Sequence, residues 1–219
     1  MAEARTAVYL EVGSKRVFAC AVDWPGWCRS GRGEREALEA LAAYAPRYAP
    51  VAAGAGQAFG ASHDFAVIER VAGSATTDFG APAAVPACDH ERLAPDSAAR
   101  LASLVAAAWV VFDRVVAGAP AELRKGPRGG GRDRDRIAEH VLAAEVAYAR
   151  KLGVRLQQPD HADRAAVARA REAIAEALRG RRPGGGAETV AGPGWPLTYM
   201  ARRVAWHVLD HAWEIEDRT

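Results

Sequence analysis

The stretch PLTYMARRVAWHVLDHAWEIED, residues 196–217, decides the fold of the second half of the chain. Apolar residues recur in it every three or four positions, which predicts an amphipathic helix. His207 and His211 are four positions apart, so they lie on one face of that helix, about one turn from each other. Met200 and Val204 lie close to the same face. Both imidazoles are therefore expected to point inward rather than toward solvent.

Three further segments upstream have the same helical periodicity, and Gly- and Pro-rich connections separate them. The four expected helices cover residues 97–117, 132–152, 161–180 and 196–216. Helices of about twenty residues with such connections predict an antiparallel four-helix bundle over residues 97–219. The Gly-rich connections at 126–131 and 180–194 match no Walker phosphate loop. We interpret them as flexible loops, with a lid or an anion-contacting mouth as the alternative.

A third histidine, His140, lies on the apolar stripe of the second expected helix. Three inward histidines from two helices predict a metal site that suits zinc or nickel and leaves a coordination position open for water or substrate. The alternative is that these histidines are hydrogen-bonded members of an ordinary core. The remaining histidines are expected at the surface: His63, His90 and His161.

The first fifty residues have a different periodicity, with apolar residues alternating at 8–12 and 17–22 around a short turn. Period-two alternation predicts half-buried strands joined as a hairpin. A third extended piece follows the turn at 24–27, and a helix begins after Gly33 and is expected to end at Pro46 and Pro50. The expected fold class is therefore α+β, with a small β-β-β-α domain at 1–50, a linker at 51–96 with one candidate strand at 65–71, and the helical bundle.

Composition limits the function classes. The chain has 219 residues with 29 Lys and Arg against 27 Asp and Glu, a net charge of +2, which gives no electrostatic support for nucleic-acid binding. Its three cysteines lack CxxC spacing and support neither a disulfide framework nor a cysteine zinc site. We see no signal peptide and no stretch of about 20 continuous apolar residues, so we expect a cytoplasmic protein without a membrane span.

Residues 196–217 together with RIAEHVLAAE at 136–145 resemble the DinB/YfiT-like superfamily. That superfamily has a four-helix bundle in which one histidine of the second helix and an HxxxH pair of the last helix bind a divalent metal. The resemblance covers about residues 97–219 and implies His140, His207 and His211 as the ligands. It also implies thiol transfer, thiol-dependent isomerisation or metal-dependent hydrolysis as the activity.

The first of these activities is our leading expectation: a transferase that activates a small thiol for addition to an electrophilic small molecule. The Ala- and Arg-rich, actinobacterial-looking composition suggests mycothiol as the thiol. Glu214, three positions beyond His211, is the candidate general base or orienting partner, and Arg203 is the candidate contact to an anionic substrate. Ordinary salt bridges are the alternative for both residues.

Residues 5–50, with VDWPGW at 22–27 and the helix that follows, are similar to the HicB-like antitoxin fold. This segment lacks an obvious DNA-binding tail, so a cap on the bundle or a homodimer contact is the expected role. Two further functions remain open. One is a metal-dependent hydrolase of a small molecule, and the other is a non-catalytic, antitoxin-like protein that binds a partner through its first domain.

Overall fold

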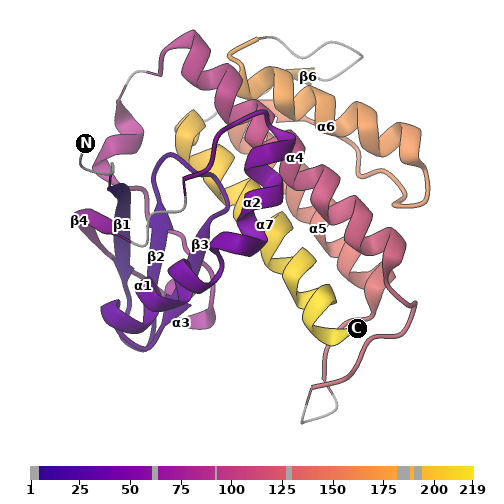
Figure 1. The fold of residues 1–219 in the computed structure, drawn as a ribbon. Helices are drawn as coiled ribbons and strands as arrows, with labels where there is room; N and C mark the ends of the chain where they lie inside the picture. The colour runs from indigo at the N-terminus through magenta and orange to yellow at the C-terminus, as the bar shows by residue number, and fades with distance from the viewer. Residues whose placement is uncertain (1–4, 61–63, 92, 127–129, 182–187, 190–193) are drawn as a thin grey trace. The chain divides into compact units, whose positions relative to one another are not determined.

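The computed structural model describes the chain except residues 1–4, 61–63, 92, 127–129, 182–187 and 190–193. The chain forms two compact units, Met1–Arg92 and Leu93–Thr219. The first contains a four-stranded sheet with short helices and the second contains four long helices, so the expected α+β class is confirmed (Figure 1).

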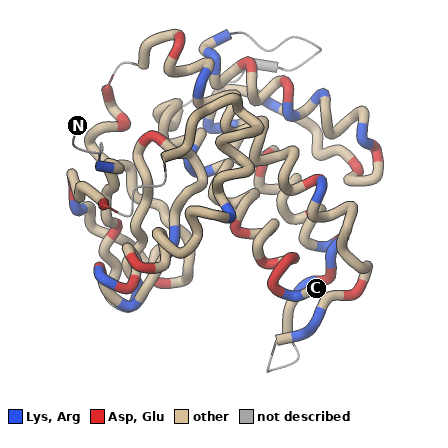
Figure 2. The backbone as a smooth tube through the Cα atoms, in the orientation of Figure 1, with Lys and Arg blue, Asp and Glu red and all other residues tan. Residues whose placement is uncertain are grey.

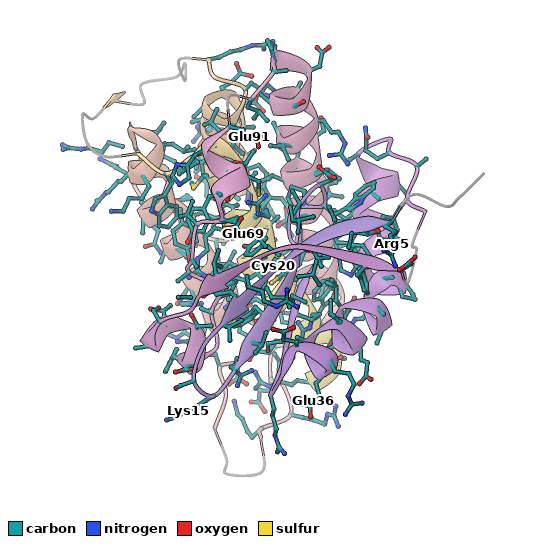
Figure 3. The ribbon with its side chains drawn as sticks, turned by 90° about the vertical axis from the view of Figure 1, so that its left-hand side faces the viewer. Arg5, Lys15, Cys20, Glu36, Glu69 and Glu91 are labelled. Atoms are coloured by element: carbon teal, nitrogen blue, oxygen red, sulfur yellow. The ribbon has the colours of Figure 1, made fainter. Side chains whose placement is uncertain are left out.

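The sheet of the first unit is mixed. Its strands are β1 (Thr6–Val12), β2 (Val17–Ala21), β3 (Cys28–Gly31) and β4 (Phe65–Ala72). The order is β3-β2-β1-β4, with β2 antiparallel to β1 and β3 and with β4 parallel to β1. The turn between β1 and β2 is closed by the Gly13 amide, which donates to the carbonyl of Arg16 at 2.9 Å. In Figure 3, Lys15 marks this turn at one end of the sheet.

The helices of the first unit are α1 (Glu34–Ala43), α2 (Ala45–Gly54), α3 (Ala75–Phe79) and the 3-10 turn η1 (Ala87–His90). Helix α1 ends at Ala43, just before Pro46, but a second helix that was not expected follows at once, and both Pro46 and Pro50 lie within it. Pro46 is in the first turn, where the amide that proline lacks has no partner within the helix. The helical region therefore continues to Gly54.

Aromatic side chains form much of the core of this unit. Trp27 is 1% exposed, stacks on Tyr48 and donates its indole N–H to the carbonyl of Leu41 at 2.8 Å. The Tyr48 hydroxyl in turn donates to the carbonyl of Pro25 at 3.0 Å. Each polar tip of these buried rings thus has a backbone partner, as a buried Trp or Tyr requires.

A buried carboxylate connects the sheet to the segment after α3. Glu11 of β1 is fully buried and accepts hydrogen bonds from the Thr77 hydroxyl and from the backbone amides of Ala83 and Ala84. The periodicity of the sequence predicts an N-terminal domain that ends near residue 50, followed by a linker. In the structure, β4 pairs with β1 and Glu11 binds the chain beyond α3, so the first unit continues to Arg92.

The second unit contains four long helices, α4 (Pro95–Gly118), α5 (Arg134–Ala149), α6 (Arg164–Leu178) and α7 (Leu197–Arg218). They lie where helical periodicity predicts them, although α5 and α6 are shorter at both ends. After α5 the chain forms the turn η2 (Arg150–Leu152) and ends it at Gly153, whose φ of 75° is in the left-handed region. A small antiparallel ladder, for which the sequence has no clear signal, pairs β5 (Val154–Arg155) with β6 (Glu188–Thr189).

Of the described helices, α4 is the one that is long and apolar enough to cross a membrane, by length and composition alone. Its most apolar window has a mean hydropathy of 1.7, and half of that window is buried. The helix contacts α7, α6 and α5, and Leu104, Val105 and Ala108 are fully buried. These contacts place one face of α4 in the core of the second unit.

A buried charged network joins α4, α5 and α6. The Arg171 guanidinium of α6 donates to both carboxylate oxygens of Glu145 on α5, at 3.2 and 3.3 Å, and to Asp113 on α4 at 2.9 Å. Trp109 of α4 donates its indole N–H to Glu145 at 2.8 Å. The side chains of Arg171 and Glu145 are 7% and 4% exposed. Burial raises the pKa of Glu145, while Arg171 and Trp109 act in the opposite direction.

Removing the cation of this network should destabilise the second unit. We expect Arg171→Met to lower the free energy of unfolding by about 3–5 kcal/mol, because it leaves the buried Glu145 carboxylate without its counter-charge. Urea unfolding followed by Trp fluorescence measures the change.

Arg136→Met is the matched control, because the 74% exposed Arg136 pairs with Glu139, a neighbour on its own helix. That exposed pair is worth at most about 1 kcal/mol. Equal unfolding curves for the two variants would contradict the structural role of Arg171.

Candidate metal centre

The three predicted histidines come together in the second unit. His140 lies on α5, and His207 and His211 lie one turn apart on α7, which packs against α5. One ring nitrogen from each residue lies within 4.8 Å of the others, and the ring centroids are 4.7 to 5.0 Å apart. The prediction that these three residues form a cluster able to hold a metal ion is confirmed.

One pair of these nitrogens has the spacing of two ligands of one ion. Nε2 of His140 and Nε2 of His207 are 3.2 Å apart. Two nitrogens that each lie about 2.0–2.1 Å from a tetrahedral zinc ion are about 3.3–3.4 Å from each other. The donor set is therefore compatible with a borderline divalent ion such as zinc or nickel, which imidazole nitrogens bind well.

Burial keeps two of these imidazoles neutral. Burial, followed by the charges of His211 and His140, lowers the pKa of His207 to about 2. Burial and His211 also lower the pKa of His140. Only a neutral imidazole has the free electron pair that a metal needs, so this environment favours the ligand form at neutral pH.

The third histidine has a carboxylate partner. Nδ1 of His211 is 2.8 Å from Glu214 Oε2, and the Arg218 guanidinium donates to the other oxygen of Glu214 at 2.7 Å. Hydrogen bonding from His211 lowers the pKa of Glu214, with Arg218 adding to the effect. The ionised Glu214 accepts the Nδ1 proton of His211 and leaves its Nε2 free as a ligand, which is how carboxylates orient metal-binding histidines.

Arg203 lies close to the cluster but contacts aromatic rings. Its guanidinium carbon is 4.9 Å from the ring centre of Trp206 and 5.6 Å from that of Tyr148. Tyr148 lies edge-on to His207, with centroids 5.9 Å apart. The positive charge of Arg203 also contributes to the lowered pKa of His207. Tyr148 was not among the predicted site residues, although its position eight residues after His140, near the same helix face, is a usable signal.

The remaining histidines and the Gly-rich connections lie apart from the cluster or outside the described residues. His161 precedes α6, with its Nδ1 3.5 Å from Asp160, and His90 is in η1 of the first unit. His63 lies outside the described residues, as do most of the two Gly-rich connections expected as loops or lids, at 127–129, 182–187 and 190–193.

A separate cavity lies on the other side of α5. It has a volume of about 550 Å³ between α4, α5 and α6 and is lined by Trp109, Phe112, Asp113, Leu142 and Arg171 among others. None of the three clustered histidines lines it. The cavity therefore belongs to the region of the buried charged network and not to the histidine cluster.

No family model, curated protein or solved structure matches this chain. The metal centre is therefore inferred from its own geometry: three imidazoles from two helices lie close together, and a carboxylate orients one of them.

The cluster should bind one divalent ion per chain. We expect wild-type protein to retain stoichiometric zinc or nickel after dialysis, and His140→Ala, His207→Ala and His211→Ala each to lose it, because two imidazoles do not supply the three protein ligands of such a site. Elemental analysis of the purified proteins measures the metal content. His161→Ala is the control and should keep the metal. A wild-type protein that binds no more metal than the His140→Ala variant would refute the centre.

Glu214 should affect metal affinity without being a ligand. We expect Glu214→Ala to weaken metal binding by about 10- to 100-fold, because His211 loses the carboxylate that orients it. Competition with a chelating dye measures the affinity. Glu216→Ala, an exposed carboxylate on the same helix, is the control and should bind like wild type. Unchanged affinity in Glu214→Ala would show that the carboxylate only pairs with Arg218.

Proposed function

We propose that this protein is a divalent-metal-dependent transferase that activates a low-molecular-weight thiol for addition to an electrophilic small molecule. The observation that carries the proposal is the cluster of His140, His207 and His211, whose ring nitrogens lie within 4.8 Å of one another. Three histidines leave part of the coordination sphere of an ion open, and this distinguishes a catalytic metal from a structural one.

The arrangement of the second unit supports the proposal that α4–α7 form an antiparallel bundle of the DinB/YfiT-like kind. Each of these helices contacts the other three, and α4 and α7 share the most extensive contact. The histidines come from the second and the last of the four helices, as the resemblance implies.

The residues around the cluster have distinct proposed roles. A bound divalent ion supplies Lewis acidity, which lowers the pKa of a thiol or water so that the anion is available near neutral pH. Glu214 holds His211 in orientation through the 2.8 Å contact at Nδ1. Arg203, held against Trp206 and Tyr148, supplies positive charge for an anionic group of the thiol or the electrophile.

We propose a cytoplasmic protein that acts on small molecules and not on nucleic acid. Lys and Arg are interspersed with Asp and Glu along the described backbone, which supports this partner class (Figure 2). Mycothiol is the first thiol to test. The first unit, with its HicB-like sequence, is proposed as a cap or a homodimer contact.

Thiol-dependent turnover tests the function. Metal-loaded protein is mixed with a small electrophile, with and without mycothiol, and loss of the electrophile is followed by mass spectrometry. We expect product only when both thiol and metal are present, and a rate at least about 100-fold lower in His140→Ala, which lacks one ligand.

The same assay separates the alternatives. Turnover that needs metal but no thiol would replace the transferase with a hydrolase. Absence of turnover in a protein that binds no metal would leave the non-catalytic, partner-binding function. His161→Ala is the control, because His161 lies outside the cluster of three histidines and its variant should turn over like wild type.

A further inference from the structure

Two of the three cysteines face each other across neighbouring strands of the first unit. Cys20 of β2 pairs in register with Cys28 of β3, and their Sγ atoms are 2.8 Å apart. Both residues are buried, at 2% and 4% exposure. In Figure 3, Cys20 lies within the sheet. The sulfurs are therefore close to bonding distance in a unit that is distinct from the histidine cluster.

The hydrogen-bond pattern identifies the kind of pair they form. The Ala21 amide donates to the carbonyl of Trp27 at 3.0 Å, so the ladder bonds flank Cys20 and Cys28 and do not join them. In such a non-hydrogen-bonded antiparallel pair the Cα atoms are about 4.5 Å apart and the side chains lie closest. A disulfide needs Cα atoms about 4.4–6.8 Å apart. The backbone thus already has a separation that a disulfide accepts.

We propose that Cys20 and Cys28 form an oxidisable dithiol that closes to a cross-strand disulfide in the presence of a small organic disulfide. One cysteine thiolate attacks the reagent disulfide, which gives a mixed disulfide and releases one reagent thiolate. The other cysteine attacks the protein sulfur of that mixed disulfide and releases the second. Two electrons pass to the reagent, and the two cysteine protons end on its two thiols.

The position of the two cysteines in the sheet limits the rate of their oxidation and determines how the disulfide affects the edge strand. Burial, followed by the neighbouring Cys20, raises the pKa of Cys28, so thiolate forms mainly when the strand opens to solvent. β3 is a four-residue edge strand, and short edge strands open more readily than central ones. Once formed, the disulfide ties this edge strand to β2 and opposes that opening.

Oxidation of a Cys88→Ser variant tests the pair without interference from the third cysteine. The native full-length protein is incubated with oxidised glutathione at pH 8 and then denatured, alkylated and mapped by mass spectrometry. We expect an intact mass lower by two hydrogen atoms and a linked peptide that contains Cys20 and Cys28. Hydrogen exchange at the β3 amides should slow on the order of 10-fold or more after oxidation.

Three outcomes would overturn the proposal: both thiols alkylated after a day of incubation, chains linked to one another, or β3 exchange unchanged by the bond. In wild-type protein, a linkage from Cys88 to either partner would also overturn it. The Cys28→Ala, Cys88→Ser double variant is the control, since its single remaining thiol gives no intramolecular bond. The Cys88→Ser protein alone decides the result if that control folds poorly.

Discussion

The ion pair between Glu145 and Arg171 is the constraint on which the second unit depends. Helix α5 is rich in alanine, and the largest side chains that it buries are Ile137, Val141 and Leu142, so apolar contact alone specifies its rotation weakly. Glu145 meets Arg171 of α6 and Trp109 of α4 with defined hydrogen bonds, and a one-residue rotation of α5 would leave a buried charge unpaired. His140 is five residues earlier, about 140° around the helix. The network thus directs His140 toward α7.

The features that could be predicted from the sequence are those with a strong local period. Helix α7 is predicted almost to its ends because its apolar positions repeat over six turns, and the i, i+4 spacing of His207 and His211 is sufficient to place both on one face. The alternation in residues 8–12 and 17–22 likewise predicts β1 and β2. To place His140 in the site, one must also assume that the apolar face of α5 that carries it packs against α7. The contact between these two helices supports this assumption.

The features that could not be predicted depend on partners far apart in the chain. β4 pairs parallel to β1 across two helices, and the burial of Glu11 depends on amides more than 70 residues later. In the sequence, Glu145 and Arg171 do not differ from ordinary surface charges, because their contact depends on the packing of α4, α5 and α6. Cys20 and Cys28 are close because β2 and β3 pair in a particular register. That register could not be predicted from the sequence, in which the cysteines lack CxxC spacing.

The geometry of the histidines also argues against a role in packing alone. A histidine kept in a core is normally hydrogen-bonded, because an unpaired buried polar atom costs about 1–3 kcal/mol. Here Nδ1 of His207 is buried without a partner among the described residues. Its Nε2 faces the Nε2 of His140, and only one of these two nitrogens can carry a proton if they are hydrogen-bonded to each other. Leu at these positions would fill the same space without either cost. Two nitrogens turned toward each other at 3.2 Å, with a third ring held by Glu214, have the arrangement expected of histidines that can bind a cation between them.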